Sequence, residues 1–153
     1  MKRVLFMAVC AAWLGFSDEL RVELRENPVG VGTDHPRFMW QIESEKPDVM
    51  QEAYRIQVAA SKDDLEKGKN LLWDSGFVDS DTSLFITYNG SQLQSATEYF
   101  WRVRVKTTGG NTAWSETQSF ATALLDSTAW KAQWIGIAGM TNPGETMGKD
   151  GAK

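Results

Sequence analysis

The segment LWDSGFVDSDTS, residues 72–83, places the carboxylates Asp74, Asp79 and Asp81 beside a tryptophan and a glycine. Two carboxyl groups held several ångströms apart can act together as a general acid and a general base. Oxygen ligands in regular alternation, closed by a bidentate glutamate, can hold calcium. No glutamate follows before Glu98, and a serine and a glycine beside an aspartate are ordinary turn formers. We therefore predict a strand, a turn and a second strand here, without a catalytic or metal site.

The one histidine, His35, offers no better chemistry. Pro36 follows it directly and restricts it to an extended conformation. A zinc site or a Ser-His-Asp triad needs more partners than a single histidine supplies. We expect a loop residue, and we predict no catalytic residue, no metal and no cofactor for the chain.

The N-terminus has the order of a secretory signal peptide over residues 1–17. Lys2 and Arg3 precede an apolar run from Val4 to Leu14, and Gly15-Phe16-Ser17 closes it. The run is too short to span a bilayer, so we predict an exported protein without a membrane span. A lipoprotein signal at Cys10 stays open as an alternative, although Val9 is bulky where that signal takes a small residue.

Charge and cysteine content narrow the function classes further. Removing Lys2 and Arg3 with the leader changes the formal net charge from −4 to −6. Nucleic-acid binding depends on clustered Lys and Arg that neutralise phosphates, so we exclude it. Cys10 is the only cysteine, so the mature domain contains no disulfide and depends on packing.

Apolar and polar residues alternate with period two between Leu20 and Thr122, as in strands with one buried face. The alternation covers residues 20–24, 38–42, 54–58 and 99–105, and it assigns Trp40, Tyr54 and Trp101 to the core. Turn formers such as Asn89-Gly90 separate the runs. The pattern predicts an all-β, two-sheet antiparallel sandwich of fibronectin III or immunoglobulin type over residues 18–123. Within residues 61–70 we expect one helical turn, capped by Ser61 and ended by Gly68.

The run LQSATEYFWRVRV resembles the E–F corner and F strand of fibronectin type III domains. The resemblance implies that Leu93, Thr97 and Tyr99 form this corner, with the tyrosine hydroxyl bonded back to the preceding loop. Trp40, the later YRIQV and the closing TTGGNTAWSETQSFAT continue the same pattern.

A narrower resemblance is carried by LRVELRENPVGV, PRFMWQI, QEAYRIQVAAS, LLWDSGFVDSD, YNG, TEYFWRVRV, WSETQSFATALL and WKAQWIG. Their order and spacing are similar to the N-terminal immunoglobulin-like module of bacterial α-L-rhamnosidases of glycoside hydrolase family seventy-eight. The resemblance implies a non-catalytic accessory module that packs against and orients downstream domains. We expect this chain to lack the catalytic (α/α)₆ barrel of that family. Residues 124–153 are expected to form a linker and the start of a truncated β-domain.

Two other functions remain open, a carbohydrate-binding module and a free-standing adhesion or assembly domain. Both would need exposed contact residues, and the candidates for docking or sugar contact are Trp73, Trp114, Arg102, Arg104, Trp130 and Trp134. We expect Trp114 to stack on Arg102 or Arg104 on the outer face of a sheet. This face, with Arg55 and Gln57 from the neighbouring strand, is the predicted docking surface. Trp130 and Trp134 lie where the next domain should begin, and Trp73 is expected to cover an edge of the core.

Overall fold

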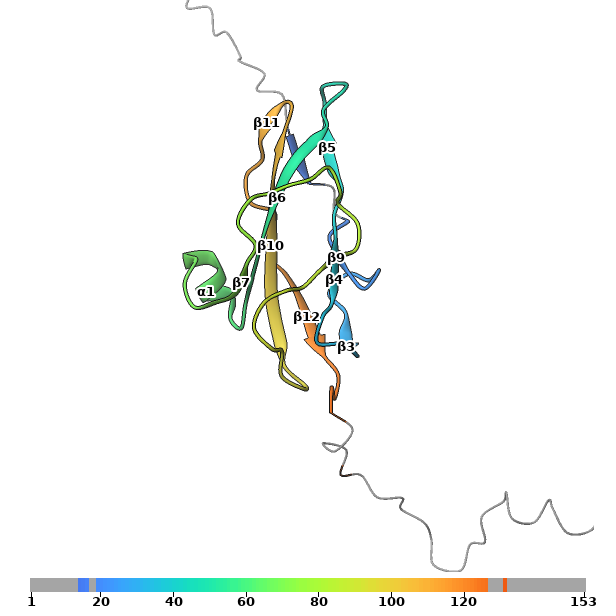
Figure 1. Cartoon of the computed structure of the whole chain (residues 1–153), viewed down its shortest axis with the longest axis vertical. Helices are drawn as coiled ribbons and strands as arrows, with labels where there is room; N and C mark the ends of the chain where they lie inside the picture. The colour runs from blue at the N-terminus through green and yellow to red at the C-terminus, as the bar shows by residue number, and fades with distance from the viewer. Residues whose placement is uncertain (1–13, 17–18, 127–130, 132–153) are drawn as a thin grey trace, which may run out of the picture.

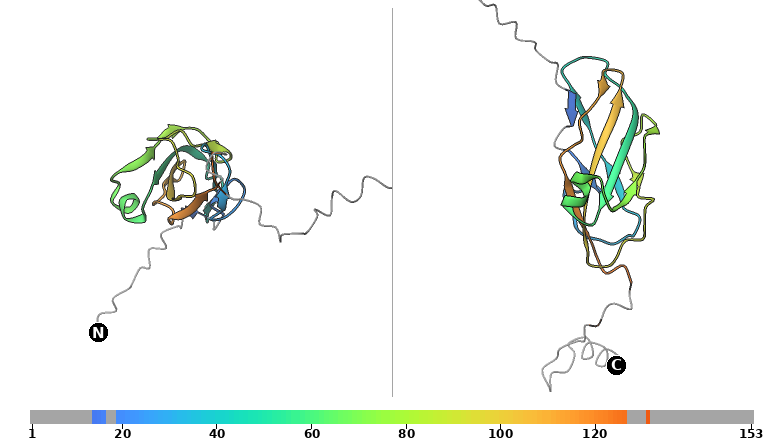
Figure 2. Two further views of the ribbon diagram at one scale, coloured as in Figure 1. Left: turned by 90° about the horizontal axis from the view of Figure 1, so that it is seen from below. Right: turned by 90° about the vertical axis from the view of Figure 1, so that its left-hand side faces the viewer.

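The computed structural model describes residues 14–16, 19–126 and 131. Two β-sheets face each other, and the chain enters at the β1 end and leaves after β12 at the opposite end (Figure 1). The view from the side shows the same elongated sandwich, with the one helix of the described residues outside it (Figure 2). Trp130, Trp134 and nearly all of the expected leader and tail lie outside the described residues.

The small sheet has the strand order β2-β4-β9, and the large sheet has the order β3-β12-β10-β6-β7. The small sheet contains β2 (Arg21–Val22), β4 (Arg37–Met39) and β9 (Ile86–Thr87). The large sheet contains β3 (Val29–Val31), β12 (Gln118–Thr122), β10 (Glu98–Thr107), β6 (Gln51–Ala59) and β7 (Leu71–Asp74), with β11 (Gly110–Asn111) beside β10 and β8 (Val78–Asp79) beside β6. The predicted all-β sandwich is confirmed, with one parallel pair, β12 and β3.

The core lies between the sheets and is built by the period-two pattern of the two longest strands. Trp101 on β10 and Ile56 on β6 are buried, as are the alternate residues around them. Aromatic rings fill the centre, where Phe38 lies 4.7 Å from Trp101 and Trp40 lies 5.2 Å from Tyr54 between ring centroids. Such pairs stabilise the core beyond the area that they bury.

Two of the predicted strands are shorter than their alternation suggests. The first ends at Val22, because Glu23 and Leu24 adopt left-handed φ angles of 49° and 68°. Leu24 is therefore 59% exposed and does not enter the core. The second predicted strand, residues 38–42, divides after Met39, and the Trp40 amide donates to the Ser83 carbonyl at 3.1 Å. The prediction of one continuous strand was wrong at both places. The alternation of apolar and polar residues indicates neither a left-handed turn of the backbone nor a change of the partner strand.

Helix α1 (Lys62–Lys67) occupies the predicted helical turn. The Ser61 hydroxyl accepts a hydrogen bond from the Asp64 amide, and Gly68 ends the helix at φ 62°. Leu65 is fully buried. It is the one buried residue of the helix.

Strand β5 (Ile42–Ser44) pairs only with β1 (Leu14–Phe16) among the described strands. The antiparallel ladder joins Leu14 with Ser44 and Phe16 with Ile42. The last residues of the expected signal peptide thus form the only described partner of β5.

Candidate docking surface

The three aspartates of residues 72–83 do not form a cluster. Asp74 ends β7, Asp79 lies in β8 and Asp81 lies in the exposed turn after it. Among residues 14–16, 19–126 and 131 there is no group of three or more His, Cys, Asp or Glu side chains that could hold a metal ion. His35 is an exposed loop residue whose Nδ1 lies 2.8 Å from an Asp34 carboxylate oxygen.

Asp74 instead completes a row of side chains across the outer face of the large sheet. The strand register places Arg102 beside Gln57, and Gln57 beside Asp74. Arg55 Nε donates to Asp74 at 2.8 Å, and Gln57 Nε2 donates to the same carboxylate at 2.8 Å. The Arg55 hydrogen bond is the main reason that the pKa of Asp74 falls to about 2.

Trp114 covers this row. Its ring centroid lies 4.3 Å from the Arg102 guanidinium carbon and 5.9 Å from that of Arg55. Arg102 also donates from Nε and Nη2 to Gln57 Oε1, at 3.0 and 2.7 Å. Burial lowers the pKa of Arg102. We call Arg55, Gln57, Asp74, Arg102 and Trp114 the arginine–tryptophan face.

Trp114 holds its place although it lies before β12 and outside every described strand. The adjacent Ser115 bonds to β10 in both directions: its amide donates to the Val103 carbonyl at 2.8 Å, and its hydroxyl accepts from the Val103 amide at 3.0 Å. These bonds fix the indole above Arg102. The stacking expected for Trp114 therefore involves Arg102.

The other cations of this sheet face are also engaged within the module. Arg104 Nε donates to the Thr112 carbonyl at 3.0 Å, and Lys106 Nζ lies 4.3 Å from the Phe77 ring centroid. The polar groups of the predicted docking surface thus have partners inside the module. The sequence indicated Trp114, Arg102, Arg55 and Gln57 for this face. It did not indicate Asp74, whose contribution depends on the strand register.

Trp73 is half-buried and packs against the core, as expected for a residue that covers its edge. Its ring centroid lies 6.0 Å from Phe38 and 5.3 Å from Tyr88. Gly90 presses against it, and a Cβ at this position would lie 2.5 Å from Trp73 Cβ. Trp73 therefore fixes where the chain after β9 crosses β7.

The corner residues lie together at the end of the sandwich where the chain leaves. The Tyr99 hydroxyl accepts a hydrogen bond from the Gln94 amide at 2.7 Å, and Leu93 is 3% exposed. Thr97 Oγ1 donates to the Ser95 carbonyl at 3.0 Å. These bonds hold the loop between β9 and β10 in a fixed shape.

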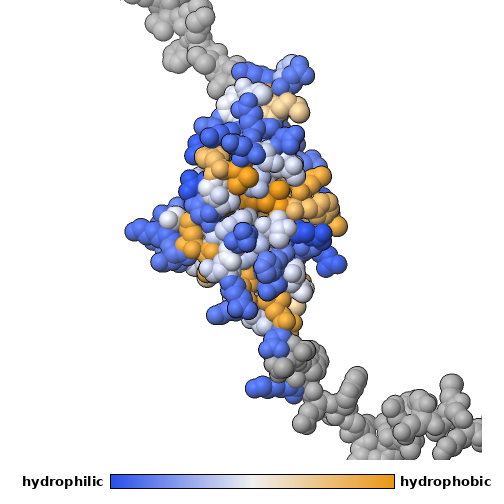
Figure 3. All heavy atoms as spheres, viewed as in Figure 1, coloured by the Kyte–Doolittle hydropathy of each residue, from blue (hydrophilic) through white to orange (hydrophobic). Residues whose placement is uncertain are grey.

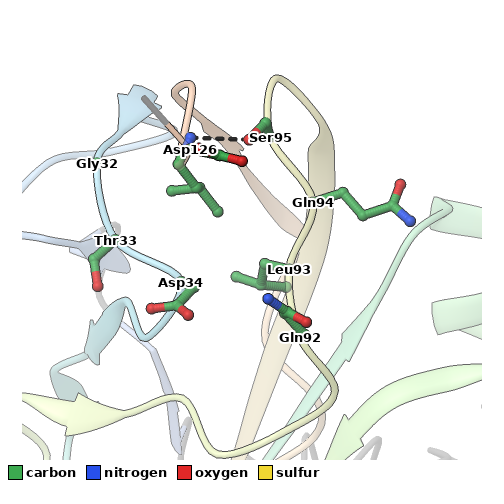
Figure 4. Close-up of a pocket in the computed structure, with 9 residues that line it drawn as sticks. Gly32, Thr33, Asp34, Gln92, Leu93, Gln94, Ser95 and Asp126 are labelled. Atoms are coloured by element: carbon green, nitrogen blue, oxygen red, sulfur yellow. Dashed lines mark hydrogen bonds between the residues drawn. The ribbon is translucent and has the colours of Figure 1, made fainter. Parts of the chain in front are cut away.

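This loop forms one wall of a pocket of about 590 Å³ (Figure 4). The opposite wall is the segment after β3, and residues after β12 close one side. Leu93 points into the space, whereas Gln94 points away from it. The Ser95 hydroxyl accepts a hydrogen bond from the Leu125 amide at 2.9 Å and so ties the exit segment to the loop. We call this space the exit pocket.

Large apolar side chains are exposed on the side of the small sheet. Leu24, Leu84 and Phe85 are 59%, 54% and 47% exposed, and apolar atoms gather on the side where β4 and β9 lie (Figure 3). Arg37 joins this region, since its guanidinium lies 5.1 Å from the Phe85 ring centroid and binds the Glu23 carboxylate. The pairing with Arg37 lowers the pKa of Glu23.

No helix in the described part of the chain is long and apolar enough to cross a membrane.

Comparison with known proteins identifies the family of this module. Residues 17–126 match the family described as the Rha78A-like N-terminal immunoglobulin domain. An α-L-rhamnosidase of Formosa agariphila is 35% identical over 130 residues, which are 84% of this chain and 14% of that protein. An α-L-rhamnosidase of Streptomyces avermitilis is 39% identical over 115 residues, 74% of this chain and 11% of that protein.

Solved structures agree. The Streptomyces avermitilis α-L-rhamnosidase in complex with L-rhamnose superposes with a TM-score of 0.75 at 35% identity, over 81% of this chain and 12% of that one. An α-L-rhamnosidase of Dictyoglomus thermophilum gives a TM-score of 0.75 at 31% identity, over 80% and 14%. The chain thus spans only about one seventh or less of the length of these relatives. The sandwich, its corner and the matched residues together show that this chain belongs to the family of Rha78A-like N-terminal immunoglobulin domains.

Proposed function

We propose that this chain is a non-catalytic accessory module of an exported α-L-rhamnosidase-like glycoside hydrolase, and that it packs against and orients the domains that follow it. The observation that carries this proposal is the match of residues 17–126 to an N-terminal domain family, together with relatives of which the aligned residues make up only 14% and 11%. Hydrolysis of terminal rhamnose belongs, in this proposal, to the longer protein.

The side-chain chemistry of the described residues supports a structural role. Rhamnoside hydrolysis needs two carboxyl groups facing each other across a cleft. Asp74 is occupied by Arg55 and Gln57, and Glu23 is occupied by Arg37. Carboxylates held by arginine in this way serve sheet geometry and are poor proton donors.

An exchange of modules tests the proposal. In the Streptomyces avermitilis enzyme, the matching module would be deleted in one variant and replaced by residues 17–126 of this chain in another. We expect the deletion to lower the thermal stability and the rhamnosidase activity, and the replacement to restore both. An unrelated fibronectin III domain in the same place is the control. Full activity and stability in the deletion variant would contradict the proposed role.

The isolated chain provides a second test. We expect no release of rhamnose when residues 1–153 are incubated with an aryl α-L-rhamnoside at high protein concentration. Export is tested separately, by expressing the chain in a bacterial host and locating it by cell fractionation. Retention in the cytoplasm would contradict the proposed export and leave the accessory role untouched.

Carbohydrate binding is the main competing function, and two contacts speak against it. Trp73 is packed against Phe38 and Tyr88, and Trp114 is stacked on Arg102. Affinity titration with rhamnosylated oligosaccharides distinguishes the two functions. Binding tighter than about millimolar that is lost on Trp114→Ala would favour the binding module.

A free-standing adhesion or assembly domain would use an exposed sheet edge for contacts between chains. In that case the purified chain should self-associate with rising concentration, which analytical ultracentrifugation detects.

A further inference from the structure

Three large apolar side chains gather on the side of the small sheet, and we call Leu24, Leu84 and Phe85 the leucine–phenylalanine patch. Each of them is about half exposed. Arg37 on β4 connects them, because its carbonyl accepts a hydrogen bond from the Glu23 amide at 3.0 Å and its guanidinium carbon lies 5.1 Å from the Phe85 ring centroid. The patch therefore joins the turn after β2 to the segment before β9 across one strand (Figure 3).

The backbone holds two of these side chains outside the core in an unfavourable conformation. Leu24 has a φ of 68° and Phe85 has a φ of 57°, in the left-handed region that is rare for bulky residues with a Cβ atom. Neither side chain offsets this cost by burial within the module. Strained residues of this kind cluster at sites of contact and function.

The patch carries no unpaired charge. Arg37 Nη2 lies 2.6 Å from one Glu23 carboxylate oxygen, and Arg37 Nε donates to the other at 3.1 Å. Aromatic and arginine side chains are enriched at the centre of contacts between proteins, where unpaired charges are scarce. A bound sugar would need free polar groups for its hydroxyls, whereas Arg37 and Glu23 bind each other. The patch thus fits an apolar, uncharged surface of another protein domain.

The size of the patch indicates what kind of domain covers it. A stable contact between separate proteins buries about 800 Å² on each partner, whereas the patch offers three half-exposed side chains. A domain of the same chain needs less area, because the linker keeps it at a high effective concentration. The relatives have room for such domains, since the aligned residues make up only 14% and 11% of them.

We infer that the leucine–phenylalanine patch is the surface on which another domain of the same longer protein docks, through an apolar contact centred on Phe85. This inference deepens the proposed accessory role and rests on it. It assigns the contact to the small sheet. The arginine–tryptophan face of the large sheet, whose charges are paired internally, then serves the stability of the module.

Hydroxyl-radical footprinting followed by mass spectrometry tests the contact directly. It compares the isolated chain with the exchanged enzyme, in which residues 17–126 replace the matching module of the Streptomyces avermitilis enzyme. Oxidation of Leu84 and Phe85 should fall several-fold in the exchanged enzyme. Met50 is 62% exposed and bonded through its amide to Thr108, and it should be oxidised equally in both proteins. Equal oxidation of the patch in the two proteins would overturn the inference.

Phe85→Asn separates docking from the stability of the module itself. Asparagine tolerates a left-handed φ better than phenylalanine, so the isolated variant should unfold at an unchanged or higher urea concentration. In the exchanged enzyme, the same substitution should lower the melting temperature and remove the protection of Leu84. Met50→Asn is the matched control for an exposed apolar residue and should change neither protein. An equal effect of Phe85→Asn on the isolated chain and on the exchanged enzyme would speak against the docking surface.

The docking surface and the accessory role can fail separately. An exchanged enzyme that regains activity and thermal stability while its patch stays exposed refutes the docking surface and keeps the accessory role. An exchanged enzyme that regains neither refutes the accessory role, and the docking surface with it.

Discussion

At the scale of single residues, Asp74 gives the module a pH-dependent contribution to stability. Its pKa lies at about 2 in the folded chain, against 3.8 for an unperturbed aspartate. A lowered folded pKa stabilises the fold above the unfolded pKa, and this contribution is lost as the pH falls from about 4 through about 2. We expect it to be about 1 kcal/mol at neutral pH, after discounting for solvent around a side chain that is 27% exposed.

Asp74→Asn tests this assignment. The free energy of unfolding, measured by urea titration between about pH 2 and pH 6, should fall by about 1 kcal/mol at the upper end and change little at the lower end. Asp81→Asn, in an exposed turn, is the matched control and should leave the profile unchanged. An identical pH profile for the parent chain and Asp74→Asn would assign the acid sensitivity to other carboxylates.

Gly90 is required by close packing and not by its φ angle. A Cβ there would lie 2.5 Å from Trp73 Cβ, 2.5 Å from the Tyr88 hydroxyl and 2.6 Å from the Leu72 carbonyl oxygen. Because backbone atoms are among the neighbours, relief needs movement of the chain. We expect Gly90→Ala to reduce the free energy of unfolding by about 1–3 kcal/mol. Thermal denaturation measures this loss. Gly32→Ala, where a Cβ meets no atom within 4 Å, is the control and should leave the free energy of unfolding almost unchanged.

At this scale, the sequence predicted correctly the burial of residues that lie within a regular alternation. Trp40, Tyr54 and Trp101 are buried, and alternation alone assigned them to the core. The pairing of Arg55 with Asp74 was out of reach because it depends on the register of β6 against β7, which contains a bulge between Val58 and Ala59.

At the scale of elements, α1 depends on its cap. The Ser61 hydroxyl accepts from the Asp64 amide at 3.1 Å, and the helix is only one and a half turns or so long. Ser61→Ala should lower the free energy of unfolding by about 1 kcal/mol, and Ser61→Asp should restore it because aspartate caps equally well. Denaturant titration measures both, and equal losses in the two variants would point to packing instead.

The pairing of β5 with β1 makes a further prediction about exchange. Removing residues 1–16 takes away the only described partner strand of Ile42–Ser44. The β5 amides that pair with β1 should then exchange with solvent much faster, while amides of β6 keep their protection. Hydrogen–deuterium exchange followed by mass spectrometry measures this. Unchanged protection of β5 would mean that another part of the chain covers this edge.

The end of the first predicted strand shows why the sequence misplaced some element boundaries. Residues 20–24 alternate perfectly, but Glu23 turns away from the strand to bind Arg37 through its carboxylate. Arg37 lies fourteen residues further along the chain, so the alternation within residues 20–24 carries no sign of this bond. The cap and stop of α1 were predictable because Ser61 and Gly68 act within one turn of the helix.

At the scale of the whole molecule, the large sheet and the small sheet present different surfaces. The arginine–tryptophan face satisfies its own charges, whereas Leu24, Leu84 and Phe85 leave apolar area exposed beside Arg37. Phe85 also has a left-handed φ of 57°, which is rare for a bulky residue. The overall fold could be predicted from the sequence because apolar and polar residues alternate along the long strands. Which surfaces carry paired charges and which carry exposed apolar side chains depends on contacts between strands that are distant in the sequence.

The order of strands in the large sheet also has a consequence for how the module is made. Its first strand, β3, pairs with its last, β12, and β6 pairs with β10. A chain emerging from the ribosome cannot complete this sheet until Thr122 has been synthesised, and contacts between residues so distant in sequence form slowly. The core aromatic residues therefore cannot be fully enclosed before residues 118–122 have been made, and completion of the large sheet coincides with the appearance of the segment that leads onward.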